Sequence, residues 1–520
     1  MPAPPADLKY NSLEEIEQIH KELRDSFQTG KTAEIGFRKH QLKQLSFLLN
    51  DNVEAIVDAI GKDLGRCRFE SVFAEITLCA NECIDAYENI EKWAKADNKW
   101  FGVVWSMHAP KEIKEPKGTV LVMGAWNYPI SVQVGPLVAA LAAGNTAVLK
   151  PSEVAAHSAK LLAELWPKYM DPSMSRIING AIPETTKLLD LRWEHILYTG
   201  NGNVGRIVAE KAAKWLCPTT LELGGKSPVF IDEHADFNIA AHRLLWAKSI
   251  NCGQTCIAPD YIVCTKQVQD KLVEHLKRVQ KEFWPQSPRK SKDYGRIINE
   301  RHFARLSGLI DKTKGSIVLG GDRDEADRFF EPTVVADVKP GDSVMSDEIF
   351  GPILPILVVK DIEEAIDYVN DHDQPLALYA FVNAKNMDHI VKRTRSGGVV
   401  QGDLMLHYTV PLTFGGTGPS GYGAYHGRAG FDTFSHTRCM VSAPATGVLG
   451  KITEALMASR YPPYTDGNLK MLRMLLGRSP GFKRPEKVYT GKESGGMFSR
   501  VSALFTLLVI VAAVAYGRQS

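Results

Sequence analysis

The sequence predicts an α/β protein built on parallel sheets, because short apolar runs alternate with stretches of helical periodicity through most of the chain. Apolar runs at 118–124 and 145–150 are each followed by a helical stretch, at 131–143 and 154–168. Alternation of this kind is typical of parallel strands joined by right-handed helical crossovers. A second alternating region begins near Lys226, so we expect two α/β domains with a boundary near 223–226, preceded by a mainly helical N-terminal region.

The composition indicates a folded protein that has little affinity for nucleic acid. A chain of 520 residues allows roughly two to four domains of ordinary size. Its 44% hydrophobic and 23% charged residues are close to the average for globular proteins. The formal net charge is only +2, which provides no overall field for binding nucleic acid. Eight cysteines without a CxxC pair argue against a disulfide framework and a zinc site, so we expect free thiols in a reducing compartment.

An apolar segment near the C-terminus predicts a membrane anchor. Residues 501–516 carry no charge and would span about 24 Å as a helix, which is closer to the thin endoplasmic reticulum bilayer than to a typical one. Arg500 and Arg518 flank the segment and would extend its reach by snorkelling. A buried core helix is the alternative interpretation of the same residues.

The residues before this segment are strongly basic and indicate its orientation. Between 470 and 500 the local net charge is +6. Positive residues beside an apolar span stay on the cytosolic side of a membrane and are attracted to anionic lipid. We therefore expect the body of the protein on a cytosolic membrane face. The endoplasmic reticulum is favoured, and the mitochondrial outer membrane, peroxisome and lipid droplet are alternatives. A short amphipathic helix, capped by Asp466 or Asn468, is expected just upstream.

A glycine-rich turn at 199–205 (TGNGNVG) has the G-x-G-x-x-G spacing of a dinucleotide-binding loop. It follows an apolar run and opens a helical stretch, which is the context that this motif requires. Its glycines would let the backbone approach a pyrophosphate at the helix N-terminus. Alone the match is weak, because glycine-rich turns between strand and helix are common. In an ordinary dinucleotide fold, the acid that binds ribose would be Glu222.

Glu222 and Cys256 together suggest covalent catalysis instead. Glu222 ends an apolar strand just before two glycines, and Cys256 lies among small residues in NCGQTCIA (251–258). A thiolate can attack a carbonyl carbon, and a separate carboxylate can later activate a water molecule. Each residue alone also fits a structural role, as a buried thiol or as a capped strand end.

Six sequence motifs carry a family resemblance. In chain order they are AWNYP (125–129), KPSE (150–153), ELGGK (222–226), GQTC (253–256), EIFGP (348–352) and FGGTGPSG (414–421). Together they resemble the aldehyde dehydrogenase superfamily over about residues 15–440. FDTFSH (431–436), YPPY (461–464) and the C-terminal apolar segment are similar to the class 3 branch, in particular to its membrane-bound fatty aldehyde dehydrogenases.

The resemblance implies a catalytic role for three residues. Cys256 would be the nucleophile that adds to the aldehyde to give a thiohemiacetal. The side-chain amide of Asn127 and the backbone N–H of Cys256 would hold the developing oxyanion. Glu222 would activate the water that hydrolyses the following thioester, and so would not also bind ribose.

The resemblance also implies a nicotinamide dinucleotide site. Lys150 and Glu153 resemble ligands of the adenine ribose, and Glu348 and Phe350 resemble contacts of the nicotinamide ribose. A carboxylate at Glu153 would repel a 2′-phosphate, which favours NAD over NADP. Asn201 stands where the family usually has serine. The turn residues expected near the pyrophosphate are Gly200, Asn201, Gly202, Asn203, Val204 and Gly205.

By the same resemblance, the chain comprises a Rossmann-like NAD-binding domain, an α/β catalytic domain, a small dimerisation hairpin and a C-terminal tail, and it forms a homodimer. The implied ranges are 1–98 and 117–223 for the NAD-binding domain, 99–116 for the β-hairpin, 224–440 for the catalytic domain with its C-terminal dimerisation strand, 441–500 for C-terminal helices and a basic linker, and 501–516 for the transmembrane anchor.

The predicted function is NAD-dependent oxidation of medium- to long-chain aliphatic aldehydes to carboxylic acids at a membrane surface. A dehydrogenase for aromatic aldehydes, or one that acylates coenzyme A, is an alternative on the same fold. Acylating members typically lack the glutamate found at Glu222. A catalytically silent membrane scaffold is a further alternative, against which the intact set of Asn127, Glu222 and Cys256 argues. No metal-ligand pattern is visible, and Cys252 fits a packing role.

Overall fold

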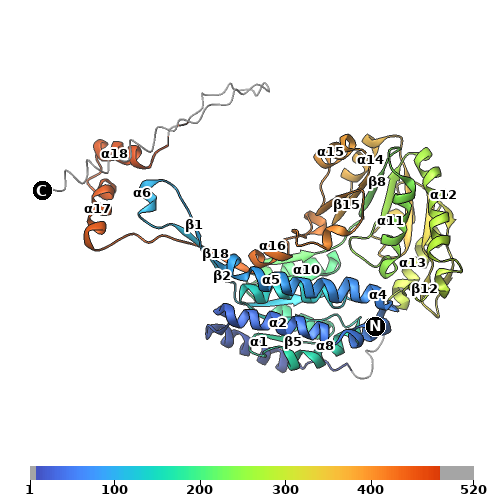
Figure 1. Ribbon diagram of the computed structural model, residues 1–520, viewed down its shortest axis with the longest axis horizontal. Helices are drawn as coiled ribbons and strands as arrows, with labels where there is room; N and C mark the ends of the chain where they lie inside the picture. Colours follow the sequence, from blue (N-terminus) through green and yellow to red (C-terminus); the bar gives the residue numbers. More distant parts are fainter. Residues whose placement is uncertain (1–7, 479, 481–520) are drawn as a thin grey trace. The chain divides into compact units, whose positions relative to one another are not determined.

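The computed structural model describes residues 8–478 and 480 (Figure 1). The chain divides into two compact units. One consists of the residues up to Trp93 together with Glu115–His436, and the other of Ala94–Lys114 and the residues from Thr437 onward. The first unit contains two large sheets, each covered by helices.

The first sheet has six strands in the order β17-β7-β6-β3-β4-β5. Five strands are parallel, and only β17 runs antiparallel to its neighbour β7. Parallel strands buried on both faces carry continuous apolar runs, which is why the sequence pattern located most of them. The strands are β3 (Thr119–Met123), β4 (Thr146–Lys150), β5 (Ser175–Ile177), β6 (His195–Thr199), β7 (Thr219–Glu222) and β17 (Gly421–Tyr422).

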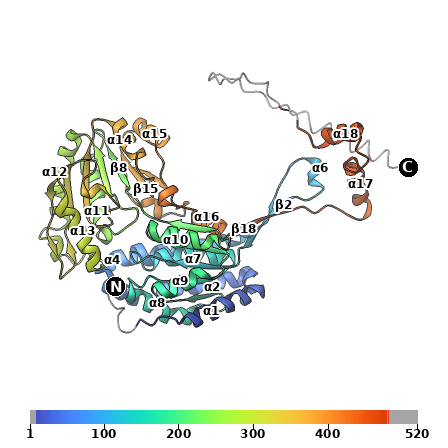
Figure 2. The same ribbon diagram turned by 180° about the vertical axis from the view of Figure 1, so that it is seen from behind.

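Helices cover both faces of this sheet, as Figures 1 and 2 show from opposite sides. Leu23 of α1, Leu188 of α9 and Val208 of α10 share one core with Leu121 of β3. Helix α7 packs against β3 and β4 and is covered by α2 and α16, so every residue of α7 is buried. The helices are α1 (Leu13–Gln28), α2 (Ile35–Asp51), α7 (Ser131–Ala143), α8 (Ala156–Tyr169), α9 (Ile182–Asp190), α10 (Gly202–Ala213) and α16 (Gly427–Thr433).

The second sheet has seven strands in the order β10-β13-β14-β9-β8-β15-β16. Only β10 is antiparallel to its neighbour, and the other pairs are parallel. The strands are β8 (Pro228–Ile231), β9 (Tyr261–Cys264), β10 (Ser316–Leu319), β13 (Thr333–Val338), β14 (Ile353–Val358), β15 (Ala377–Phe381) and β16 (Gly398–Gln401), and a separate pair is formed by β11 (Arg323–Asp324) and β12 (Phe329–Phe330).

Five helices flank the second sheet. Leu306 of α13, Ile366 of α14 and Ile390 of α15 belong to one core with residues of β9, β13 and β14. Helix α12 packs on α11 and against β10 and β14. The helices are α11 (Phe237–Ser249), α12 (Lys266–Phe283), α13 (Glu300–Lys312), α14 (Ile362–Asn370) and α15 (Ala384–Arg393).

The expected helical N-terminal region is present. After α2, the chain continues through α3 (Val53–Leu64), α4 (Arg68–Ser71), a π-helical turn η2 (Val72–Thr77) and α5 (Leu78–Ala94). A 3₁₀ turn, η3 (Ile250–Gly253), follows α11 and leads to Cys256. The other 3₁₀ turns are η1 (Lys31–Ala33), η4 (Pro288–Lys290), η5 (Ser343–Met345), η6 (Leu406–Tyr408), η7 (Gly418–Ser420) and η8 (Ala458–Arg460).

Among the described residues, the second unit contains a three-stranded sheet in the order β1-β2-β18 and three α-helices. Asp97 pairs with Glu112, so the hairpin expected at 99–116 begins slightly earlier, and a short helix lies between its strands. Its part in dimerisation stays a prediction. The cap expected at Asp466 or Asn468 is wrong, because the Thr465 hydroxyl accepts the Asn468 N–H and caps the helix. These elements are β1 (Asp97–Asn98), α6 (Val103–Ser106), β2 (Lys111–Pro116), β18 (Ser435–Met440), α17 (Gly447–Met457) and α18 (Asp466–Leu476).

The membrane anchor predicted at 501–516 lies outside the described residues. Within residues 8–478 and 480, no helix is both long and apolar enough to cross a bilayer. The anchor therefore stays a prediction from the sequence.

Candidate active site

The predicted site residues lie at the ends of strands in the two large sheets. Lys150 ends β4 and Glu222 ends β7, so both lie at the carboxyl edge of the first sheet. Cys256 and Glu348 lie in the segments that precede β9 and β14 of the second sheet. Open parallel sheets bind their ligands beyond the carboxyl ends of the strands. The first sheet thus provides the usual position for a ligand, and the second supplies residues to it.

Cys256 and Glu222 line the same cavity. The space inside it, including open solvent, is about 700 Å³. Most of the other lining side chains are apolar or aromatic. They are Phe73, Ala74, Leu78, Tyr128, Val132, Trp246, Ile250, Ile257, Leu376, Met405, Leu406, Tyr408, Phe414 and Tyr425, with Thr199, Thr255 and Thr409 as the hydroxyl-bearing threonines. The cavity therefore surrounds two chemically reactive groups with a largely apolar wall.

Glu222 is a buried carboxyl group whose charge is stabilised by no hydrogen bond from the described residues. Only 2% of the residue is exposed, and neither carboxylate oxygen has a hydrogen-bond partner among the described residues. Burial raises the pKa of Glu222 well above its usual range. A carboxylate with a raised pKa is a stronger proton acceptor than an exposed one, which suits a general base.

Cys256 is a partly exposed thiol at the end of the loop that follows η3. Burial and the nearby carboxyl groups of Glu348 and Glu222 raise its pKa to about 12. The protein without ligand therefore holds Cys256 as a neutral thiol at physiological pH. The thiol must lose this proton before its sulfur can act as a nucleophile.

The buried Asn127 lies beside the cysteine loop. Its side-chain Nδ2 donates to the backbone carbonyl of Gln254 at 3.0 Å, two residues before Cys256. An amide nitrogen carries two hydrogens, so this bond uses one of them. The neighbouring Tyr128 hydroxyl lies 2.8 Å from Thr255 Oγ1 and ties the same two segments together. The structure thus brings Asn127, Glu222 and Cys256 into one region.

The first sheet also presents the features expected of a dinucleotide site. At the end of β4, the Lys150 ammonium pairs with Glu153 at 2.8 Å. Asn201 caps α10, its side chain accepting the Val204 N–H at 3.0 Å, so it performs the capping role of a serine. A Cβ on Gly205 would lie 3.0 Å from Leu223, which explains a glycine there. Nearby, the buried Thr199 hydroxyl has no partner among the described residues.

These features fit a nicotinamide dinucleotide. The first N–H groups of α10, from Gly202 and Asn203, have no intrahelical partners and suit a pyrophosphate. On the opposite side, the Glu348 carboxylate approaches Gly224 so closely that a Cβ there would lie 2.2 Å from Oε2. Burial and Asp260 raise the pKa of Glu348 to about 8. Phe350 has φ +48°, and its ring packs edge-on against Trp126 with the ring centres 5.4 Å apart.

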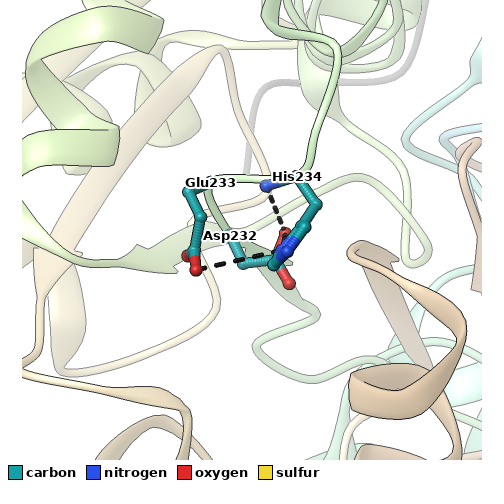
Figure 3. Close-up of side chains that lie close together, drawn as sticks. All are labelled: Asp232, Glu233 and His234. Atoms are coloured by element: carbon teal, nitrogen blue, oxygen red, sulfur yellow. Dashed lines mark hydrogen bonds and ion pairs between the residues drawn. The ribbon is translucent and has the colours of Figure 1, made fainter.

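One cluster of three potential metal ligands occurs among the described residues, and it lies elsewhere. Figure 3 shows Asp232, Glu233 and His234 just after β8. Asp232 already accepts the His234 N–H at 2.9 Å and an Asn386 Nδ2–H at 2.8 Å. The first bond closes the turn between β8 and α11 and the second ties this turn to α15, so we assign the cluster a structural role.

Several residues that hold the site together carry no motif in the sequence. The buried Arg66 and Glu75 form an ion pair of 2.6 Å. Glu75 accepts the backbone N–H groups of Ile130 and Ser131, and Asn251 donates to the Asn127 carbonyl at 2.8 Å. Arg66 and Glu75 are only nine residues apart, but the backbone groups that they also bind lie 55 to 61 residues away and carry no side-chain signal in the sequence.

Comparison with known proteins agrees with this geometry. The aldehyde dehydrogenase family model matches residues 4–440. A rat protein named "Aldehyde dehydrogenase, dimeric NADP-preferring" is 43% identical over 458 residues, covering 87% of this chain and 98% of the relative. A mouse protein named "Aldehyde dehydrogenase family 3 member A2" is 45% identical over 457 residues, covering 87% and 93%. The substrate-bound structure of Staphylococcus aureus AldH has a TM-score of 0.84 at 36% identity, covering 88% of this chain and 99% of that one.

The chain therefore belongs to the aldehyde dehydrogenase family, and its relatives confirm the resemblance to the class 3 branch. It has the family's α/β fold and is an aldehyde-oxidising enzyme with a nicotinamide cofactor.

Proposed function

We propose that this chain oxidises medium- to long-chain aliphatic aldehydes to carboxylic acids with NAD. The observation that carries the proposal is the cavity that places Cys256 and Glu222 among apolar walls. An apolar wall favours a substrate with a hydrophobic body, since each methylene removed from water contributes about 0.8 kcal/mol.

In this proposal each catalytic residue handles one step. The Cys256 thiol releases its proton to solvent, and the thiolate sulfur bonds to the aldehyde carbon. The second N–H of Asn127 and the Cys256 N–H stabilise the oxyanion of the resulting thiohemiacetal. When bound, the nicotinamide ring accepts the hydride that leaves this carbon. Glu222 then deprotonates the water that cleaves the thioester, which releases the acid and regenerates the thiol.

Glu153 supports NAD as the cofactor. Its carboxylate would repel the 2′-phosphate of NADP, and the Lys150 ammonium at 2.8 Å holds it in place. The rat relative is named NADP-preferring, so this residue is worth testing directly. We expect Glu153→Gln to improve kcat/KM for NADP relative to NAD. An unchanged ratio would contradict the proposed role of Glu153.

A series of aldehydes tests the substrate. NADH formation would be measured with hexanal through hexadecanal and with benzaldehyde, and Cys256→Ser would serve as the inactive control. We expect kcat/KM to rise with chain length. A preference for benzaldehyde would favour the aromatic alternative, for which Tyr408, Phe414 and Tyr425 would supply the wall. Dependence on coenzyme A, or no NADH from any aldehyde, would overturn the proposal.

The location and assembly are proposed on the sequence and the relatives together. The apolar 501–516 segment and the basic residues before it support a C-terminal anchor, with the body on the cytosolic face of the endoplasmic reticulum. The word "dimeric" in the name of the rat relative supports a homodimer. Sedimentation of the detergent-extracted full chain would test the dimer, and a monomer would contradict it.

A further inference from the structure

Arg66 lies at the junction of three segments that surround the site. It follows the left-handed Gly65 that ends α3, and only 3% of the residue is exposed. Its guanidinium donates from Nη1 to Glu75 at 2.6 Å, from Nη2 to the backbone carbonyl of Asn127, and from Nε to Asn251 Oδ1 at 3.2 Å. The planar guanidinium thus uses all three of its nitrogens on separate segments.

Two of these segments carry the proposed catalytic groups. The Asn127 carbonyl bound by Arg66 also accepts Asn251 Nδ2 at 2.8 Å. Asn251 Nδ2 in turn donates to the Gln254 carbonyl at 3.0 Å, which is the same acceptor that the Asn127 side chain uses. The guanidinium therefore fixes the position of the Asn127 amide relative to the loop that ends at Cys256.

That loop has a strained backbone. Asn251, Cys252 and Gly253 have φ angles of +51°, +51° and +69°, so three consecutive residues are left-handed. This region is unfavourable for Cys252 and less so for Asn251, and such strain persists only where the surroundings impose it. Here Arg66 holds the Asn251 side chain, and Glu70 accepts the Asn251 N–H at 3.0 Å.

Glu75 completes the junction. Its Oε1 accepts a hydrogen bond from Arg66 Nη1, while Oε2 accepts the N–H groups of Ile130 at 3.0 Å and Ser131 at 2.7 Å. These amides lie at the start of α7, immediately after the Asn127 loop. The guanidinium also lies 4.6 Å from the centre of the Tyr128 ring. The loop that carries Asn127 is therefore held from both ends.

We propose that Arg66, paired with Glu75, is a positioning residue that aligns the Asn127 amide with the Cys256 loop for oxyanion binding. The proposal deepens the function proposed above and rests on it. The ion pair is internally neutralised, and Arg66 is not among the residues that line the cavity. Its effect is therefore on the geometry of the site, and a displacement of about 1 Å of a reacting group costs on the order of 100-fold in rate.

The test compares Arg66→Ala with Arg38→Ala in the full chain. Arg38 is also a buried arginine, and among the described residues its guanidinium bonds to the backbone carbonyls of Thr32, Ala33 and Ala142. We expect both variants to unfold at lower temperature. Only Arg66→Ala should show a lower kcat, by on the order of 100-fold, while its KM for NAD stays close to that of the wild type. Low concentrations of guanidinium chloride should restore part of the kcat of Arg66→Ala and none of any loss in Arg38→Ala.

Two further readouts make the outcome decisive. Arg66→Lys, which keeps one charge but cannot reach three acceptors, should fold and still show reduced kcat. Alkylation of Cys256 by iodoacetamide, followed by peptide mass spectrometry, needs no turnover and should change in rate and pH profile in both Arg66 variants. Equal kcat losses in the Arg38 and Arg66 variants, or unchanged alkylation with no rescue, would overturn the proposal. If the wild type oxidises no aldehyde, the proposed function fails, while the alkylation assay still reports on Arg66.

Discussion

Glu222 combines a catalytic position with an environment that disfavours its charge. In the proposed reaction it activates the water that cleaves the thioester, so Glu222→Gln should stop the reaction after the hydride has left. We expect one NADH per active site in a rapid burst and then a steady rate lowered by about 10²–10⁴-fold. Rapid mixing with decanal would measure the burst, and intact-mass spectrometry would detect an acyl group on Cys256. Full turnover by Glu222→Gln would exclude this glutamate as the base.

The same residue makes stability depend on pH. Burial raises the pKa of Glu222 in the folded state, so the folded protein binds this proton more tightly than the unfolded chain does. The stability that this proton provides is complete below the unfolded pKa and is lost as pH rises through the folded value. Glu222→Gln should therefore unfold at a higher temperature than the wild type at pH 8, with a smaller difference at pH 5.

Thermal unfolding of both proteins across this range would measure the effect. Glu274→Gln is the control, since this glutamate is exposed on α12 and pairs with the nearby Lys277. The pH trend of Glu274→Gln should follow the wild type. If Glu222→Gln raised the unfolding temperature by the same amount at pH 5 and pH 8, the pH dependence of stability would not come from Glu222.

At the scale of elements, the loop after α11 and the loop before β14 approach each other at Gly253. A Cβ on Gly253 would lie 2.4 Å from the Gly351 carbonyl oxygen, and the residue has φ +69°. Gly253→Ala should therefore separate the Cys256 loop from the Glu348 loop. We expect a loss of about 2–5 kcal/mol in unfolding free energy, from strain and overlap together, with lower kcat and weaker NAD binding.

Gly341→Ala is the matched control for this substitution. Gly341 has φ +85° and no heavy atom within 4 Å of its Cβ position, so only backbone strain of about 1–2 kcal/mol is expected, with unchanged kcat. Chemical denaturation and NAD titration of both variants would separate strain from overlap. Equal effects of the two substitutions would contradict a specific contact at Gly253.

The elements differ in how far the sequence could predict them. The runs at 118–124 and 145–150 located β3 and β4 to within about one residue, because strands buried on both faces leave an uninterrupted apolar signal. The hairpin expected at 99–116 was less accurate. Asp97 and Asn98 form its first strand without any apolar alternation, so pairing with Glu112 and Lys111 is determined by tertiary context and not by local pattern.

At the scale of the whole molecule, the sequence located the proposed reacting groups better than their supports. Asn127, Glu222 and Cys256 stand in motifs, and parallel topology brings strand ends together, so their convergence could be expected. Arg66 could not be found in this way. Its bonds join residues up to 185 positions apart and include a backbone carbonyl, which carries no side-chain signal. The apolar wall of the cavity was likewise drawn from many separate elements.

The proposed anchor makes a prediction about the whole chain. A hydrophobic aldehyde partitions into bilayers, so holding the cavity at the bilayer surface raises the substrate concentration that it meets. Deleting 479–520 should move the protein from floated vesicles to the unbound fraction. It should lower kcat/KM for hexadecanal supplied in vesicles and leave kcat/KM for propanal in buffer unchanged.

The matched control keeps the length and the basic residues but carries Leu508→Lys and Val511→Lys, since each lysine in mid-bilayer costs about 2.5–3.5 kcal/mol. It should behave as the deletion does, because both lack the span. If the lysine variant still floats, the basic segment and not the apolar one holds the membrane, and if hexadecanal is oxidised equally well by all three, the anchor serves some purpose other than access to substrate.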